Sequence, residues 1–213
     1  MKGLLLKDFM NIMRNKKLLI LLLAFYVGLG FFMDSNVSVC GMTVFFLSYQ
    51  LLTAFSFDEA GKWERFAMTM PLSRRQLVSS KYILMLLLIG LGFLLSCVMG
   101  GILNVIHPVE GEGFREIAVA AAGVSAAFLI LFSLMMPFIF RLGMEKARLL
   151  LIICFALPAL GVYAVISLAR KYSIPMPGEE DIRLLISLVP VFLAGITAVS
   201  WLISVRVFRK KEL

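Results

Sequence analysis

The feature that most constrains this chain is a series of long stretches without a charged side chain. Five of them cover residues 35–57, 82–109, 117–140, 149–169 and 184–205. Each is long enough to cross the roughly 30 Å hydrocarbon core of a bilayer as a helix. Of all residues 61% are hydrophobic and 16% are charged, against about 45–50% and about 25% in soluble domains. The composition therefore argues against a soluble enzyme and predicts an integral membrane protein.

A sixth apolar stretch, residues 18–33, is shorter, but Lys16 and Lys17 could reach the interface and let it span. A cleaved signal peptide is the alternative, yet no small-x-small cleavage site follows, so we expect the segment to be retained. We predict an all-α integral membrane protein that forms a single transmembrane domain over residues 1–213. Its six predicted spans cover about residues 18–33, 36–57, 82–106, 117–140, 149–169 and 184–205.

Basic residues indicate the orientation of the spans. If the N-terminus is cytoplasmic, 17 of the 21 Lys and Arg residues lie on the inner side, as the positive-inside rule requires. The exception is the outer loop 170–183, with Arg170 and Lys171. Both termini are therefore expected in the cytoplasm. The net charge of +8 suits contact with the anionic lipids of the inner leaflet, and no nucleic-acid partner is expected.

The longest predicted inner connection, residues 58–81, contains start and stop signals for a short helix. Gly61 is placed to end the helix before it, and Pro71 is placed to end the short helix. Ser73 and Gln76 have the spacing of a capping box that would begin the following helix. One face of the short helix is apolar, at Trp63, Phe66, Ala67 and Met70. The helix could lie on the lipid surface or dock on a cytoplasmic partner, and composition favours neither.

The N-terminal segment, residues 2–16, is predicted to be an amphipathic helix in the inner interface, with Lys7 and Asp8 on its polar side. Its apolar side consists of Leu5, Phe9, Ile12 and Met13, helped by Leu6 and Met10.

Polar and small residues inside the predicted spans are candidates for helix packing or for a substrate path. In the third span the small residues recur every four positions, a spacing that lets two helices approach closely. Ala118, Ala122 and Ala126 repeat the spacing in the fourth span. The candidates are Tyr49, Gln50, Thr53, Gly92, Ser96, Gly100 and Asn104.

Motifs for catalysis are missing from the sequence. It contains neither HExxH nor a phosphate-binding loop, and its lone histidine, His107, lies in a predicted outer loop. The three cysteines form no metal-binding spacing. We read the acidic residues 179–181 as part of a solvated outer loop. We therefore expect no catalytic residue, metal or cofactor on this chain, so ATP-driven work would require another polypeptide.

The sequence resembles the permease subunits of bacterial ABC-2-type ABC exporters, and more narrowly the small permeases related to exporters of phenol-soluble modulins and antimicrobial peptides. The weaker of the two matching stretches is residues 4–9, and the more specific one combines residues 63–66, 70–78 and 81–82. The resemblance implies six helices and a multi-pass location in the bacterial plasma membrane. It also implies a dimer with a second copy or a paralogue, and partner ATPases that bind ATP and magnesium.

In such a complex residues 58–81 would contain the coupling helix, which docks in a groove of the ATPase. Carried onto this chain, the coupling residues would be Trp63, Glu64, Arg65, Phe66, Met70 and Arg74. The outer connection 170–183 departs from the family in being short and rich in proline, which argues against an elaborate external gate.

These observations predict a subunit of an ATP-driven exporter. Because the five longer spans have no charge in their cores, we expect an amphipathic peptide, a drug or a lipid-like molecule as cargo. The alternative is a membrane scaffold or sensor subunit that recruits a cytoplasmic protein and transports nothing.

Overall fold

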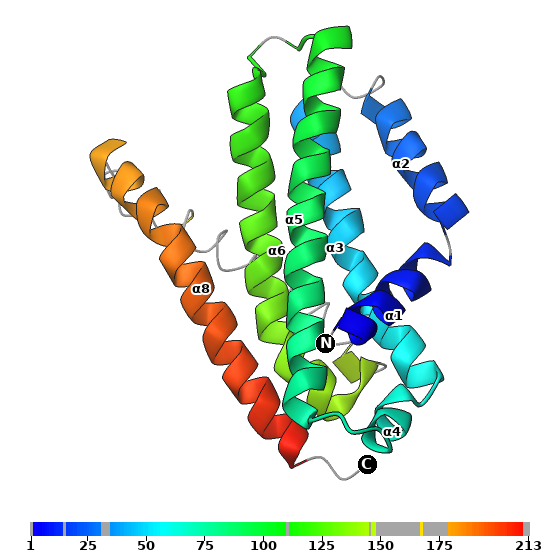
Figure 1. Cartoon of the computed structure of the whole chain (residues 1–213). Helices are drawn as coiled ribbons and strands as arrows, with labels where there is room; N and C mark the ends of the chain where they lie inside the picture. The colour runs from blue at the N-terminus through cyan, green and yellow to red at the C-terminus, as the bar shows by residue number, and fades with distance from the viewer. Residues whose placement is uncertain are drawn as a thin grey trace. The chain divides into compact units, whose positions relative to one another are not determined.

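The computed structural model describes residues 2–14, 16–30, 35–109, 111–144, 146–147, 167 and 179–210. Regular structure in this part of the chain is entirely helical (Figure 1). The helices are α1 (Lys2–Met13), α2 (Lys16–Gly30), α3 (Asn36–Ala60), α4 (Trp63–Met68), α5 (Arg74–Ile106), α6 (Phe114–Leu142) and α8 (Glu179–Arg209). The predicted all-α class is confirmed for the described residues.

Four helical stretches in the described part are long and apolar enough to cross a membrane, judged by length and composition. They are Asn36–Ala60, Arg74–Ile106, Phe114–Leu142 and Leu188–Arg209, which match the second, third, fourth and sixth predicted spans. The predicted first span overlaps α2, whose 15 residues end at Gly30. The predicted fifth span, 149–169, lies outside the described residues except for Ser167, so the number of six spans stays a prediction.

Two helices extend beyond the predicted spans to the ends that their capping signals predicted. Since α3 continues to Ala60 and α5 begins at Arg74, the connection between these helices covers residues 61–73. Charged residues mark the edge of the hydrocarbon, but backbone hydrogen bonds continue past it. The N-terminal helix is shorter than predicted, because α1 ends at Met13 and not at residue 16. The acidic residues 179–181, predicted as loop, begin α8, where negative charge favours a helix N-terminus.

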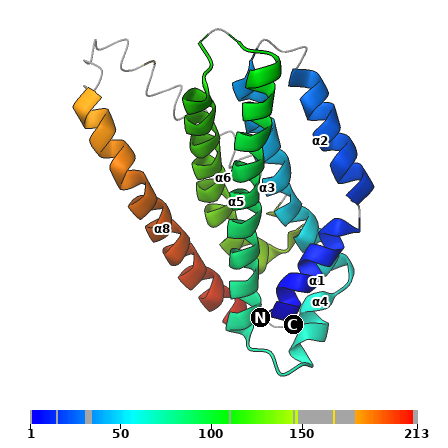
Figure 2. The same cartoon turned by 45° about the horizontal axis from the view of Figure 1, so that its top comes forward.

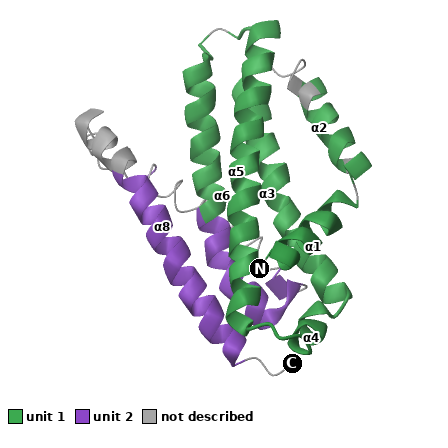
Figure 3. Cartoon of the chain, in the orientation of Figure 1, with its two compact units in different colours: residues 1–129, 212–213 green, residues 130–211 purple. Residues whose placement is uncertain are grey.

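The described helices fall into two compact units (Figure 3). Unit 1 covers residues 1–129, with 212–213, and unit 2 covers residues 130–211. Within unit 1, α3 and α5 lie side by side over most of their length, and α1, α2 and α4 pack against this pair (Figures 1 and 2).

Close packing between α3 and α5 depends on small residues. Gly92, Ser96 and Gly100 are buried along one side of α5. The Ser96 hydroxyl donates to the Cys40 carbonyl at 3.2 Å, and the Cys40 thiol donates to the Ser96 carbonyl at 3.4 Å. A β-carbon built at Gly100 would lie 2.5 Å from Cys40 Sγ and 2.6 Å from Ile117 Cγ2. Only glycine fits at this position.

Substitution of Gly100 by alanine should therefore destabilise unit 1 by about 1–3 kcal/mol, the usual cost of overpacking a core. Gly90→Ala is the matched control, because a β-carbon at Gly90 meets no atom within 4 Å and alanine favours a helix over glycine by about 0.5–1 kcal/mol. The measurement is the thermal unfolding midpoint of both variants in detergent micelles. Equal midpoints would contradict the close approach of α5 to Cys40.

A carboxylate closes the N-terminal end of α3. Glu112, in the connection between α5 and α6, accepts hydrogen bonds from the backbone N–H groups of Asn36 at 2.6 Å and Val37 at 3.2 Å. Its other oxygen accepts from the hydroxyl of Ser35, the N-cap residue, at 2.8 Å. These contacts satisfy helix N–H groups that would otherwise lack partners and place a negative charge at the positive end of the helix dipole.

The described part of unit 2 comprises residues 130–142 of α6, residues that follow this helix, and α8. The helices are joined by hydroxyl groups: Ser133 and Thr197 lie 3.3 Å apart, and Ser200 donates to the Ser133 carbonyl. The Phe140 and Phe208 rings meet edge to face, with centroids 5.5 Å apart. Hydroxyl groups of this kind hold apolar helices together where lipid provides no drive for packing.

Candidate functional site

The chain enters α4 through a sharp turn. Gly61 ends α3 as predicted, and its N–H donates to the Phe57 carbonyl at 3.0 Å. However, the left-handed residue is its neighbour, Lys62, with φ of 48°. This conformation is costly for a residue with a β-carbon, and it turns the chain directly into α4 at Trp63.

A capping box holds the exit from α4. The Ser73 hydroxyl accepts from the Gln76 N–H at 3.2 Å, and the Ser73 N–H donates to the Gln76 side chain at 3.0 Å. The predicted capping box is confirmed. The connection 61–73 thus has a defined turn at its start and a capping box at its end, with the six residues of α4 between them.

The two faces of α4 differ. Ala67 is fully buried and Trp63 is half-buried, whereas Phe66 is 53% exposed and Met70, just after the helix, is 37% exposed. Arg65 is also exposed, while Glu64 and Arg74 are half-buried. Of the six predicted coupling residues, the structure thus presents Arg65, Phe66 and Met70 outward and turns Trp63 inward. The Trp63 and Phe66 ring centroids lie 5.5 Å apart.

Beside α4 lies a cluster of four charged side chains that the sequence did not reveal. We call Lys7, Asp8, Asp58 and Lys81 the charge quartet. Lys7 Nζ lies 2.5 Å from an Asp58 oxygen and 2.9 Å from an Asp8 oxygen. Lys81 Nζ lies 3.0 Å from an Asp8 oxygen and 2.5 Å from an Asp58 oxygen. Each charge of the quartet thus has two partners of opposite sign.

The charge quartet is buried. Asp8 is only 1% exposed and Asp58 and Lys81 are 7% exposed, while Lys7 is half-buried. Charges withdrawn from water to this extent are tolerated only when they are paired and hydrogen-bonded. Two positive and two negative charges make the cluster neutral, so its members depend on one another.

Contacts with aromatic rings extend the charge quartet to α4. Lys7 Nζ lies 4.3 Å from the centroid of the Trp63 ring, and Lys81 Nζ lies 5.0 Å from that of Phe55. Both distances are within the range of cation–π attraction. The charge quartet therefore connects α1, the end of α3, the start of α5 and the inward face of α4 at a single place.

Asp8, one of the polar residues of the predicted amphipathic helix, is buried and paired in the structure. The side of α1 that packs against the protein is Leu4, Asp8 and Ile12, at intervals of four residues. Most of the predicted apolar side is exposed, at Leu6, Phe9, Met10 and Met13. One signal was available: Asp58 and Lys81 directly border two charge-free runs, where a buried pairing partner could be expected.

The predicted packing or substrate-path residues have different environments. Gly92, Ser96 and Gly100 lie in the contact between α3 and α5 described above. Gln50 is buried and donates to the Phe46 carbonyl of its own helix at 3.4 Å. Tyr49 is exposed, with its ring 6.0 Å from that of Phe45, and Thr53 and Asn104 are half-buried. Tyr49 is the one aromatic side chain in this set, and it faces outward.

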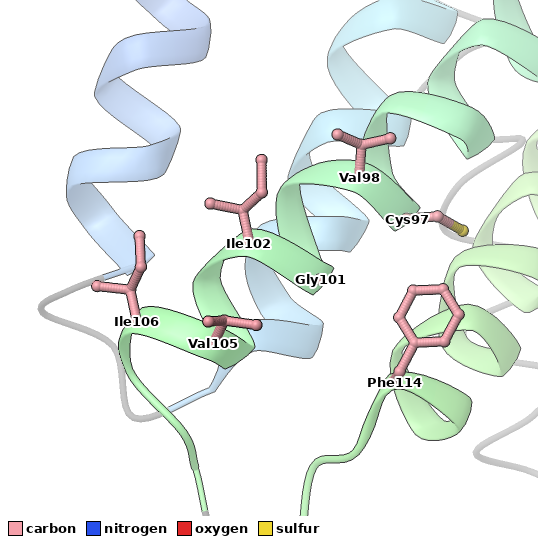
Figure 4. Close-up of a pocket in the computed structure, with 7 residues that line it drawn as sticks. All are labelled: Cys97, Val98, Gly101, Ile102, Val105, Ile106 and Phe114. Carbon is pink, nitrogen blue, oxygen red and sulfur yellow. The ribbon is translucent and has the colours of Figure 1, made fainter.

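An open apolar groove of about 500 Å³ lies beside the C-terminal half of α5 (Figure 4). Gly101 leaves room in its floor, and the Phe114 ring lies beside that glycine. Its lining residues are Cys97, Val98, Gly101, Ile102, Val105, Ile106 and Phe114. Apart from the Cys97 thiol, these side chains are hydrocarbon, so the groove suits an apolar group and not a nucleotide or a metal ion. In the described part of the chain no three His, Cys, Asp or Glu residues gather into a metal-binding cluster.

Comparison with known proteins identifies the family. The family model described as ABC-2 family transporter protein matches residues 3–209, which include α4, all of α1 except Lys2, and every residue of the charge quartet. No curated protein and no solved structure shows a significant match. The chain therefore belongs to the ABC-2 transporter family, whose members are the membrane permease components of ABC transporters and not their catalytic subunits.

Proposed function

We propose that this permease takes its driving force from a separate ATPase subunit that docks on α4, and that it exports amphipathic molecules across the bacterial plasma membrane. The observation that carries the proposal is the exposed apolar surface at Phe66 of α4 and at Met70, just after it, between the turn at Lys62 and the capping box of α5. An aromatic side chain has few rotatable bonds and loses little conformational entropy on binding, which is a property of residues that dominate interfaces.

The charge around α4 supports a protein partner. Lys62 and Arg65 are exposed beside Phe66, so the docking face combines an apolar centre with a basic rim. A partner groove with apolar walls and an acidic edge would complement it.

The charge quartet would transmit a movement of α4 to the helices of unit 1. Displacement of α4 by the ATPase would move Trp63, and Trp63 contacts Lys7. Lys7 in turn holds Asp8 of α1 and Asp58 of α3, while Lys81 of α5 holds the same two carboxylates. Closure of the ATPase dimer on ATP would thus reach three helices of unit 1 through one cluster.

The uncharged sequence of the spans supports an amphipathic peptide, a drug or a lipid-like molecule as cargo. No charged residue occurs in α3 from Asn36 to Phe57 or in α5 from Tyr82 to Ile106, and intramembrane charge is typical of ion-coupled transport. The groove beside α5 is lined by hydrocarbon. A second copy or a paralogue would complete the pathway, which then runs between two permeases.

Affinity capture from native membranes tests this function. The tagged chain should recover an ATP-binding protein, and in the purified complex amphipathic peptides should stimulate ATP hydrolysis several-fold while hydrophilic sugars should not. Recovery of a cytoplasmic protein without ATPase activity would instead favour the scaffold or sensor alternative. Stimulation by sugars alone would contradict the proposed cargo.

A further inference from the structure

The outward side of α1 is an apolar surface that the described part of the chain leaves largely exposed. Leu6, Phe9, Met10 and Met13 are all exposed on it. The opposite side of the helix, with Asp8 at its centre, packs against α3 and α5. Figure 1 shows α1 on the outside of this pair. The exposed surface requires an occupant, because four large apolar side chains in water would be unfavourable.

The charge quartet fixes the level of α1 relative to the spans. Asp58 directly follows the charge-free part of α3, and Lys81 directly precedes that of α5. Both residues therefore mark the depth at which the hydrocarbon core ends. Since Asp8 binds Lys81 at 3.0 Å and Lys7 binds Asp58 at 2.5 Å, α1 is held at that same depth, where lipid headgroups meet the acyl chains.

The accessible charges of α1 and of the first turn of α2 are all positive. Lys2, Arg14, Lys16 and Lys17 are exposed. The single acidic residue between positions 2 and 30 is Asp8, and it is buried and paired. Burial of Asp8 thus leaves an apolar strip bordered by basic side chains, a pattern complementary to an anionic lipid surface.

We propose that α1 and the first turn of α2 form a binding surface for anionic phospholipids. The four apolar side chains enter the boundary of the acyl chains, and the four basic side chains pair with headgroup phosphates. One basic residue near an anionic membrane contributes about a fivefold preference, so the four together should select anionic over zwitterionic lipid by well over tenfold. This inference goes beyond the proposed transport function and requires neither the ATPase nor a cargo.

The test uses the full-length chain alone, in mixed micelles that contain equal amounts of phosphatidylglycerol and phosphatidylcholine with identical acyl chains. Native mass spectrometry counts the lipids of each kind that stay bound. The wild type should retain phosphatidylglycerol preferentially, and the combined variant Lys2→Gln, Arg14→Gln, Lys16→Gln and Lys17→Gln should lose most of that preference. Raising the ionic strength from about 0.01 M to about 1 M should weaken it as well, because the Debye length falls from about 30 Å to about 3 Å.

A charge-preserving variant is the matched control. Exchange of lysine for arginine at positions 2, 16 and 17, and of Arg14 for lysine, alters the same four side chains and should keep the preference. If the neutral variant retains lipids as the wild type does, the proposal is wrong. It is also wrong if Phe9→Asp converts a dimer into a monomer while the lipid preference is unchanged, because the face of α1 is then a subunit interface.

Discussion

Replacement of Lys81 by methionine is expected to lower the free energy of unfolding by about 3–5 kcal/mol, the largest effect of any single substitution considered in this protein. Without Lys81, the ammonium group of Lys7 is the one remaining ion-pair partner of Asp8 and Asp58 among the described residues. One negative charge is then uncompensated at a site where Asp8 is almost completely shielded from water. Methionine retains the apolar stem, so the loss reports on the charge rather than on packing.

A second substitution should restore much of this stability. In the double variant Lys81→Met with Asp8→Asn the cluster is neutral again, because the pair of Lys7 and Asp58 remains. The double variant should be more stable than Lys81→Met alone, with a coupling energy of about 1–3 kcal/mol between the two positions.

The measurement is the thermal unfolding midpoint in detergent micelles, with Lys62→Met, at an exposed lysine, as the control. If Lys81→Met and Lys62→Met have equal midpoints, the charge quartet does not contribute to folding. A double variant less stable than both single variants would show that the hydrogen bonds of Asp8 matter more than its charge.

The second large effect is expected from substitutions on the two faces of α4, which should separate binding of the ATPase from its stimulation by cargo. Phe66→Asp should weaken binding of the partner ATPase by about 30-fold to 1,000-fold, as buried aromatic anchors of interfaces do when they are lost (about 2–4 kcal/mol). Trp63→Leu should leave binding within a few-fold of the wild type, because Trp63 is half-buried and contacts Lys7. It should nevertheless reduce the stimulation of ATP hydrolysis by cargo, since it removes the contact between α4 and the charge quartet.

The two quantities are measured separately, binding by titration of the purified ATPase and coupling by ATP hydrolysis with and without an amphipathic peptide. Phe114→Asp is the control for Phe66→Asp, because Phe114 is similarly exposed at 59% but begins α6, beside the C-terminal half of α5 and not beside α4. If Phe114→Asp weakens binding equally, the loss reflects general damage. If Trp63→Leu reduces binding as strongly as Phe66→Asp, both side chains lie in the interface and the inward role of Trp63 is wrong.

Local sequence signals predicted much of the connection that contains α4. Gly61 ends α3, and Ser73 with Gln76 forms the capping box. Such signals are reliable because each involves backbone groups within four residues of one another. The left-handed conformation of Lys62 was not predicted, since lysine has no preference for it.

Contacts between distant segments could not be predicted in this way. Asp8 and Lys81 are separated by 73 positions, and Lys7 and Asp58 by 51. Taken alone, Lys7 and Asp8 fit the polar side of an amphipathic helix, and Asp58 and Lys81 fit the ends of membrane spans. Only their convergence shows that Asp8 faces inward.

The sequence by itself determined the membrane class, the family and the position of α4. A charge-free helix is recognised by its preference for lipid over water, and a capping box by a few neighbouring residues. Tertiary structure alone decided which side of α1 is buried, which face of α4 is free, and that four charges meet between them. The physical reason is electrostatic. A buried charge is stable only beside its partner, and that partner is supplied by the packing of helices distant in the chain.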